Sequence, residues 1–270
     1  MENPLVIEST QNPRVKHAIK LRKAKVRNET GQTLVEGFRE ILRATESGWI
    51  FNELYYCPEL YIEPDTVDLV SDIQKCGIPA YRCSEAAFRK MSYRDTPDGL
   101  IALSPLVGKK LKELQLPESP LLLITEDLEK PGNLGTILRT ADATGVDAVI
   151  VCNPKTDLSN PNVIRASIGT LFFMPVAVAS TQEALEWLKE KKIQSLAAVP
   201  AAAEEYTAVD MRCGTALVVG SEDNGLSDEW INAADHRVAI PMQGRNDSLN
   251  VSTAAAILLY EAVRQRRIGR

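Results

Sequence analysis

One stretch decides the fold of this 270-residue chain: residues 121–152 read LLLITEDLEKPGNLGTILRTADATGVDAVIVC. Leu121–Thr125 is a continuous apolar run, typical of a strand that is buried on both faces. Apolar residues then recur at helical spacing over Asn133–Gly145, and Ala148–Cys152 is a second apolar run. This order predicts two parallel strands that are joined by a helix.

The same alternation continues toward the C-terminus. Apolar runs predict further strands at Pro175–Ala179, Ser195–Val199, Ala216–Gly220 and Arg237–Ile240. Helical patterns cover Asn162–Gly169, Thr181–Lys192 and Ser248–Arg267. The predicted fold class is therefore α/β, with a parallel sheet covered by helices on both faces. In such sheets, ligands bind beyond the carboxyl ends of the strands.

A polar, proline-bearing segment precedes this region and predicts a linker at residues 108–118. We expect residues 119–270 to form the parallel-sheet domain and residues 1–107 to form a smaller α/β domain. In the smaller domain, helical patterns at 13–27 and 38–47 alternate with short apolar runs typical of strands. These runs are Glu53–Cys57, Thr66–Val70, Ile78–Cys83 and Leu100–Leu103.

Composition excludes several classes of protein. The net charge of −5 argues against a polycation that coats nucleic acid, and no apolar run approaches the length of a membrane span. The N-terminus shows no secretory signal, and five cysteines without a CxxC pair fit a reducing, cytoplasmic location. With only His17 and His236, the chain offers no clustered metal ligands and little for a Ser-His-Asp relay.

Basic residues gather near the N-terminus. The stretch from Pro13 to Arg43 holds nine Lys and Arg residues but only three acidic residues. Such a patch suits contacts with an RNA phosphate backbone. An amphipathic helix with solvated lysines, and with Val15 and Ile19 on its inner face, explains the same pattern, so charge alone leaves both interpretations open.

Three polar, glycine-bearing segments, at 126–139, 218–227 and 240–252, each follow a predicted strand. Each has a purely structural interpretation. Asn133, Ser248 or Asn250 would serve as a helix N-cap, and Arg139 would form a surface ion pair with Asp142 or Glu126. Residues 218–227 would be an ordinary strand–turn–helix corner.

The chain lacks the GxGxxG, GxxxxGK[ST] and GxSxG motifs, which disfavours dinucleotide, P-loop and hydrolase chemistry. Its polar segments supply Arg, Asn, Ser and Glu instead. That set suits a reaction driven by an activated cosubstrate, in which the protein mainly positions the reacting groups.

Together, the three segments resemble the motifs of the SpoU (TrmH-type) family of RNA ribose 2′-O-methyltransferases. The motifs are Asn133–Arg139, Gly220–Ser227 and Ile240–Ser252, and the resemblance covers residues 119–270. The likeness is greatest to the rRNA-modifying branch, which includes 23S rRNA and thiostrepton-resistance methylases. The stretches 12–16 and 35–37 resemble the L30e-like RNA-binding domain that precedes many family members.

The resemblance implies S-adenosylmethionine as the cofactor, a homodimer, and a deep trefoil knot in the C-terminal domain. It implies that Gly220, Ile240 and Leu249 contact the cofactor, with Met242 in the same loop and Ala197–Val199 nearby. Residues that match the family's catalytic positions are Arg139, Asn133, Glu222, Ser248 and Asn250.

The resemblance also implies an RNA substrate, with 23S rRNA favoured, tRNA as the alternative, and a non-catalytic RNA-binding module as a second class. The expected RNA contacts are Arg14, Arg22, Arg39 and Arg165. Two roles remain open for Arg139. It would accept the proton of the ribose hydroxyl, or it would clamp a phosphate and stabilise the developing alkoxide.

Overall fold

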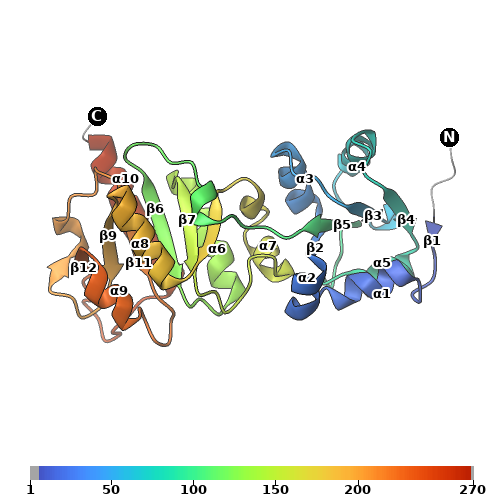
Figure 1. Cartoon of the computed structure of the whole chain (residues 1–270). Helices are drawn as coiled ribbons and strands as arrows, with labels where there is room; N and C mark the ends of the chain where they lie inside the picture. Colours follow the sequence, from blue (N-terminus) through green and yellow to red (C-terminus); the bar gives the residue numbers. More distant parts are fainter. Residues whose placement is uncertain (1–5, 269–270) are drawn as a thin grey trace. The chain divides into compact units, whose positions relative to one another are not determined.

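The computed structural model describes residues 6–268, which divide into two compact units (Figure 1). The N-terminal unit contains residues up to 107 together with residues 157–173. The C-terminal unit contains residues 108–156 and the chain from 174 onward. The first division falls between Val107 and Gly108, where we predict that the linker begins.

The C-terminal unit is built on a seven-stranded sheet of order β10-β12-β9-β11-β6-β7-β8. Every pair of neighbouring strands in it is parallel, as predicted for the strands that are apolar runs. The two-residue edge strand β10 was not predicted, because it consists of two glutamates. The strands are β6 (Leu121–Glu126), β7 (Ala148–Cys152), β8 (Val176–Ala179), β9 (Gln194–Ala198), β10 (Glu204–Glu205), β11 (Thr215–Val219) and β12 (His236–Ala239).

Helices cover both faces of this sheet (Figure 1). One layer is formed by α6 (Pro131–Thr144) and α10 (Val251–Ile268), which pack against each other, and the other by α8 (Thr181–Lys191) and α9 (Asp228–Ala233). The α6 helix ends where Gly145 adopts a left-handed conformation with φ of 69°. Short 3₁₀ turns lie at Leu111–Glu113 and Tyr206–Ala208.

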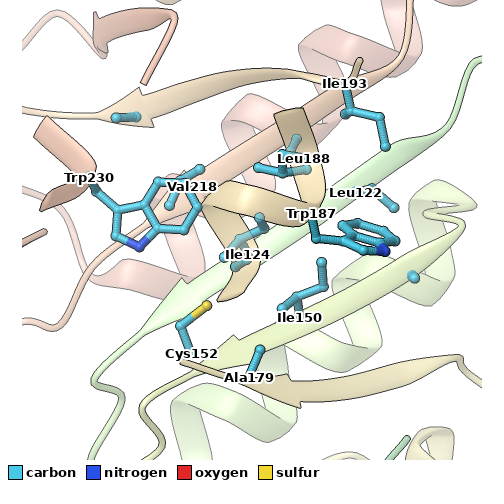
Figure 2. Close-up of a cluster of buried hydrophobic side chains, with 14 of the residues drawn as sticks. Leu122, Ile124, Ile150, Cys152, Ala179, Trp187, Leu188, Ile193, Val218 and Trp230 are labelled. Atoms are coloured by element: carbon cyan, nitrogen blue, oxygen red, sulfur yellow. The ribbon is translucent and has the colours of Figure 1, made fainter. Parts of the chain in front are cut away.

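The core on the α8 side is drawn in Figure 2. Ile124, Ile150 and Val218 of the central strands meet Trp187 and Trp230 of the covering helices. Burying each such side chain contributes about 1.5–3 kcal/mol to folding. This packing holds the strand ends, and therefore the loops that follow them, in fixed positions.

The N-terminal unit has a mixed five-stranded sheet of order β1-β4-β3-β5-β2. The β5 strand runs antiparallel to β2 and β3, and the remaining pairs are parallel. Its strands are β1 (Val6–Ile7), β2 (Gln32–Glu36), β3 (Glu53–Tyr56), β4 (Ala80–Cys83) and β5 (Leu100–Pro105). Its helices are α1 (Pro13–Lys20), α2 (Ala24–Thr30), α3 (Phe38–Glu46), α4 (Thr66–Lys75) and α5 (Glu85–Met91), with a 3₁₀ turn at Pro58–Leu60.

Several predicted elements of this unit were wrong in detail. The helix expected over 13–27 is two helices, because the chain turns at Leu21–Lys23. The run expected as a strand at Thr66–Val70 begins α4, in which Leu69, Val70 and Ile73 form one buried face. Strand β2 was not anticipated. Its residues are nearly all buried and do not alternate between apolar and polar.

Residues 157–173 were expected to lie within a continuous C-terminal domain, but they pack in the N-terminal unit. This segment, termed the excursion here, contains α7 (Pro161–Ala166) and a 3₁₀ turn at Thr170–Phe172. Asp157 pairs with the buried Arg27, and Phe172 packs on Trp49 with ring centroids 5.3 Å apart. The Ser159 hydroxyl accepts a hydrogen bond from the Val107 amide at 2.9 Å. The predicted helix at Asn162–Gly169 is correspondingly shorter, because Ile168 and Gly169 have positive φ.

Within residues 6–268, no helix combines the length and the apolar character that a bilayer span requires. The same residues contain no group of three or more His, Cys, Asp or Glu side chains arranged to hold a metal ion.

Candidate active site

A cavity of about 200 Å³ lies at the carboxyl ends of β9, β11 and β12, where parallel sheets place ligands. Its walls come from the residues that follow these strands and from the segment leading into α10. Most of the wall is apolar. The lining residues include Val199, Gly220, Glu222, Ile240, Met242, Ser248 and Leu249.

All four predicted cofactor contacts, Gly220, Ile240, Met242 and Leu249, line this one cavity. Leu249 is apolar and 38% exposed, so its side chain offers apolar surface to the cavity. Of the neighbouring residues expected to contribute, Ala198 and Val199 line the cavity, whereas Ala197 is buried in the core beneath it.

The turn after β11 is closed so tightly that only glycine fits at its start. A Cβ atom on Gly220 would lie 2.1 Å from the carbonyl carbon of Gly225 and 2.4 Å from the Leu226 nitrogen. Ser221 and Gly225 exchange backbone hydrogen bonds of 3.1 and 3.0 Å across the turn. The close backbone approach explains the glycine at this position and presents Glu222 to the cavity.

A buried carboxylate holds the far end of this turn. Glu126, at the end of β6 and 2% exposed, accepts hydrogen bonds from the Ser227 amide at 2.8 Å and from the Ser227 hydroxyl at 2.9 Å. It also accepts one from the Thr181 hydroxyl. Sequence reasoning missed this role. The signal in the sequence was a charged residue that directly follows the run Leu121–Thr125, which is typical of a buried strand.

Asn133 and Asn250 come together beside the cavity, at a distance of 3.4 Å between the Asn250 Nδ2 and Asn133 Oδ1 atoms. Asn250 caps α10 by accepting from the Ser252 amide at 2.9 Å, as one structural interpretation predicts. That cap starts α10 at Val251 rather than at the expected Ser248. Asn133 is not a cap, because Lys130 occupies the N-cap position of α6.

Two buried polar atoms at this site have no partner among the described residues: the amide nitrogen Nδ2 of Asn133 and the Oε1 oxygen of Glu222. An unpaired buried polar group costs about 1–3 kcal/mol, so a structure rarely keeps one without a use. One of the atoms is a donor and the other an acceptor. They are therefore available to a substrate that carries both kinds of group, such as a ribose hydroxyl.

Arg139 and Ser248 complete the expected set. Ser248 lines the cavity, and its hydroxyl lies 3.3 Å from an Asp247 carboxylate oxygen. Arg139 is exposed on α6 and does not line the cavity. It makes no hydrogen bond or ion pair with any residue between 6 and 268, so the surface pairs with Asp142 or Glu126 are absent.

The four expected RNA contacts fall into two groups. Arg14 lies over the Tyr81 ring at 4.3 Å, and the Arg22 guanidinium donates to the Ser92 carbonyl at 2.6 Å. Both are therefore engaged within the N-terminal unit. Arg39 and Arg165 are exposed and have no partner among residues 6–268.

Comparison with known proteins assigns both parts of the chain to known families. Residues 120–260, about half of the chain, match the SpoU rRNA Methylase family. Residues 12–102 match the MRM3-like substrate binding domain.

Individual relatives cover nearly the whole chain. A solved RNA 2′-O ribose methyltransferase is 40% identical, with a TM-score of 0.84 over 97% of this chain and 100% of that one. An AdoMet-bound rRNA methyltransferase from Sinorhizobium meliloti is 30% identical, with a TM-score of 0.87 over 96% and 98%. The 23S rRNA (guanosine(2553)-2′-O)-methyltransferase RlmP of Bacillus subtilis is 31% identical over 94% and 97% of the two chains. The chain therefore belongs to the SpoU family of rRNA methylases.

Proposed function

We propose that the protein transfers a methyl group from S-adenosylmethionine to the 2′-oxygen of a ribose in 23S rRNA. One observation carries the proposal. Gly220, Ile240 and Leu249, which match cofactor positions of the family, line a single cavity together with Met242 of the same loop. An unpaired oxygen of Glu222 lies in its wall, and Asn133 is in contact with Asn250 beside it. The relatives named above support both the reaction and the RNA.

The cavity residues fit the cofactor. Ile240, Met242 and Leu249 offer apolar surface for an adenine ring, and the closed turn at Gly220 allows close backbone approach. When bound, the cofactor supplies a methyl group that is already activated on a sulfonium.

The protein's own task is then to position the ribose. Ser248, Asn250 and Asn133 orient the 2′-hydroxyl through hydrogen bonds, and Glu222 accepts from a ribose or a neighbouring donor. Correct placement of two reacting groups is worth about 7–11 kcal/mol in the most favourable intramolecular cases. Positioning alone thus accounts for much of the acceleration that a methyl transfer of this kind needs.

Arg139 acts in this proposal as a cation and not as the proton acceptor. The delocalised positive charge and the forked N–H donors of a guanidinium suit the binding of a phosphate or of a developing alkoxide. Its lack of any partner among residues 6–268 leaves it available to bind a substrate phosphate and stabilise the alkoxide that forms.

The family's homodimer and trefoil knot belong to the same proposal. The resemblance supports both, and the exposed Tyr260 of α10 gives a partner subunit apolar surface to cover. Light scattering on the purified protein should then give a mass of twice the chain. A monomeric mass would contradict the dimer and leave the reaction to be tested separately.

The reaction is tested by methyl transfer from labelled S-adenosylmethionine to deproteinised 23S rRNA, 16S rRNA and bulk tRNA. The proposal predicts label in 23S rRNA. Label confined to tRNA would replace the substrate with the alternative. Failure to bind the cofactor would overturn the enzymatic function and favour a non-catalytic RNA-binding protein.

A further inference from the structure

A second cavity, of about 520 Å³, lies entirely within the N-terminal unit. It is bounded by the first turn of α3, the residues that precede α4, the loop after α5, and the excursion. The excursion contributes Arg165 and Ile168. We call it the Arg39–Arg165 cavity. Its volume lies in the range that small-ligand sites of proteins occupy.

The arginines of the N-terminal unit fall into two groups: those with a side-chain hydrogen bond or ion pair, and those without one. The unit contains nine arginines, and seven of them are held by a hydrogen bond or ion pair within the unit. The two without any partner among residues 6–268, Arg39 and Arg165, both line this cavity although they are distant in sequence. The seven engaged residues are Arg14, Arg22, Arg27, Arg43, Arg82, Arg89 and Arg94.

An internal ion-pair network forms one wall of the cavity. Arg94 pairs with Glu40 at 2.9 Å and with Asp98 at 3.3 Å, and Asp98 accepts from the Phe38 amide at 2.9 Å. A Cβ atom on Gly37 would lie 2.2 Å from the Arg94 guanidinium, so the wall is closely packed. Burial raises the pKa of Glu40, and the neighbouring Arg94 opposes that rise. These groups shape the cavity, although Arg94 Nε and Asp98 Oδ1 are buried without a hydrogen-bond partner among residues 6–268.

The groups left free in the cavity have two kinds of chemistry. Arg39 and Arg165 are unpaired donors of positive charge, which suit a phosphate. Glu63 and Asp95 are carboxylates whose side chains have no partner within residues 6–268, and they suit N–H donors. Phe38, Ile62 and Ile168 add apolar surface. A simple anion would be repelled by the carboxylates, whereas a nucleotide offers a phosphate, base N–H groups and a flat apolar ring together.

We propose that the Arg39–Arg165 cavity binds one unpaired nucleotide of the RNA substrate. Arg39 and Arg165 bind its phosphate, and Glu63 and Asp95 accept hydrogen bonds from its base. This inference rests on the proposed function, because it presupposes an RNA substrate. It also revises the expected RNA contacts, since it assigns Arg14 and Arg22 to the internal structure of the unit.

The test compares Arg39→Ala/Arg165→Ala with the control Arg82→Ala/Arg89→Ala, which removes two exposed arginines of the same unit. The substrate is deproteinised 23S rRNA. The cavity variant should raise the KM for RNA at least tenfold and reduce the slope of log affinity against log salt by about 1. Its kcat at saturating RNA and its affinity for S-adenosylmethionine should stay within about twofold of wild type. The control should match wild type throughout.

A second variant distinguishes the contribution of the base contacts to RNA binding from that of the phosphate contacts. Glu63→Gln/Asp95→Asn should raise the KM for RNA while leaving the salt slope unchanged, because base hydrogen bonds release no counterions. An unchanged KM and salt slope in Arg39→Ala/Arg165→Ala, in an active wild-type background, would overturn the cavity proposal alone. A wild-type protein that transfers no methyl group to any RNA would instead overturn the proposed function.

Discussion

The cavity of the C-terminal unit is lined by tight backbone turns at the ends of parallel strands, whereas the Arg39–Arg165 cavity is lined mainly by long charged side chains. The first site depends on exact chain geometry, as Gly220 shows, and tolerates little change. The second site depends on the charge and the length of its side chains. A substitution should therefore abolish function at the first site and weaken it by degrees at the second.

The largest effect is expected for Gly220→Ala. The added methyl group would overlap the Gly225 carbonyl carbon at 2.1 Å, so the turn must open. Binding of S-adenosylmethionine should fall below detection by calorimetry, and methyl transfer should be lost. Gly132→Ala is the matched control, because nothing lies within 4 Å of the added atom. Near-normal cofactor binding by Gly220→Ala would show that the turn is not part of the cofactor site.

Arg139→Ala should lower kcat by about 10² to 10³, the usual cost of removing one electrostatic stabiliser of a transition state. Cofactor affinity should not change, because Arg139 does not line the cavity. Arg139→Lys keeps the charge and should retain more activity than the alanine variant. If the lysine variant were as inactive as the alanine variant, the planar fork or a neutral guanidine would be required, and the cation role alone would not suffice.

Glu126→Gln should destabilise the protein by about 1.5–3 kcal/mol, because a buried carboxylate that holds Ser227 and Thr181 loses a hydrogen-bond acceptor. Urea denaturation measures this change, and weaker cofactor binding should accompany it because Ser227 ends the turn from Gly220. The exposed Glu186→Gln of α8 serves as control and should change stability by less than about 0.5 kcal/mol. Equal stability of both variants would contradict the positioning role of Glu126.

The smallest effect is expected for Arg14→Ala. Removing the contact with Tyr81 and the 3.5 Å ion pair with Glu53 should cost about 1 kcal/mol of unfolding free energy. The salt dependence of RNA binding should stay as in wild type. Arg39→Ala/Arg165→Ala should show the opposite pattern, with unchanged stability and a shallower salt slope. A shallower salt dependence of RNA binding in Arg14→Ala would show that Arg14 contacts the RNA.

The C-terminal sheet was largely predictable, because its buried parallel strands are continuous apolar runs bounded by polar loops. The N-terminal unit was less so. The amphipathic run at Thr66–Val70 suits a strand or a helix at that length, and packing of Leu69 and Ile73 decides for the helix. The excursion has no local signal, because its place depends on contacts such as Arg27 with Asp157 that join distant residues.

The same distinction applies to the sites. Gly220, Ile240, Met242 and Leu249 were predicted from the resemblance to the family's motifs, and the structure places all four on one cavity, while their contact with a cofactor stays a prediction. That Arg39 and Arg165 line the same cavity could not be predicted, because exposed arginines look alike in sequence. Only the structure distinguishes these two from Arg14 and Arg22, which form hydrogen bonds within the unit.

The most direct test of the central claim is to locate the transferred methyl group in the RNA. Labelled 23S rRNA is digested with alkali, which cannot cleave after a 2′-O-methylated nucleotide. We predict that the label appears in one alkali-resistant dinucleotide, that Gly220→Ala abolishes it, and that Arg39→Ala/Arg165→Ala retains it at saturating RNA. Label recovered in mononucleotides would place the methyl group on a base and contradict the account.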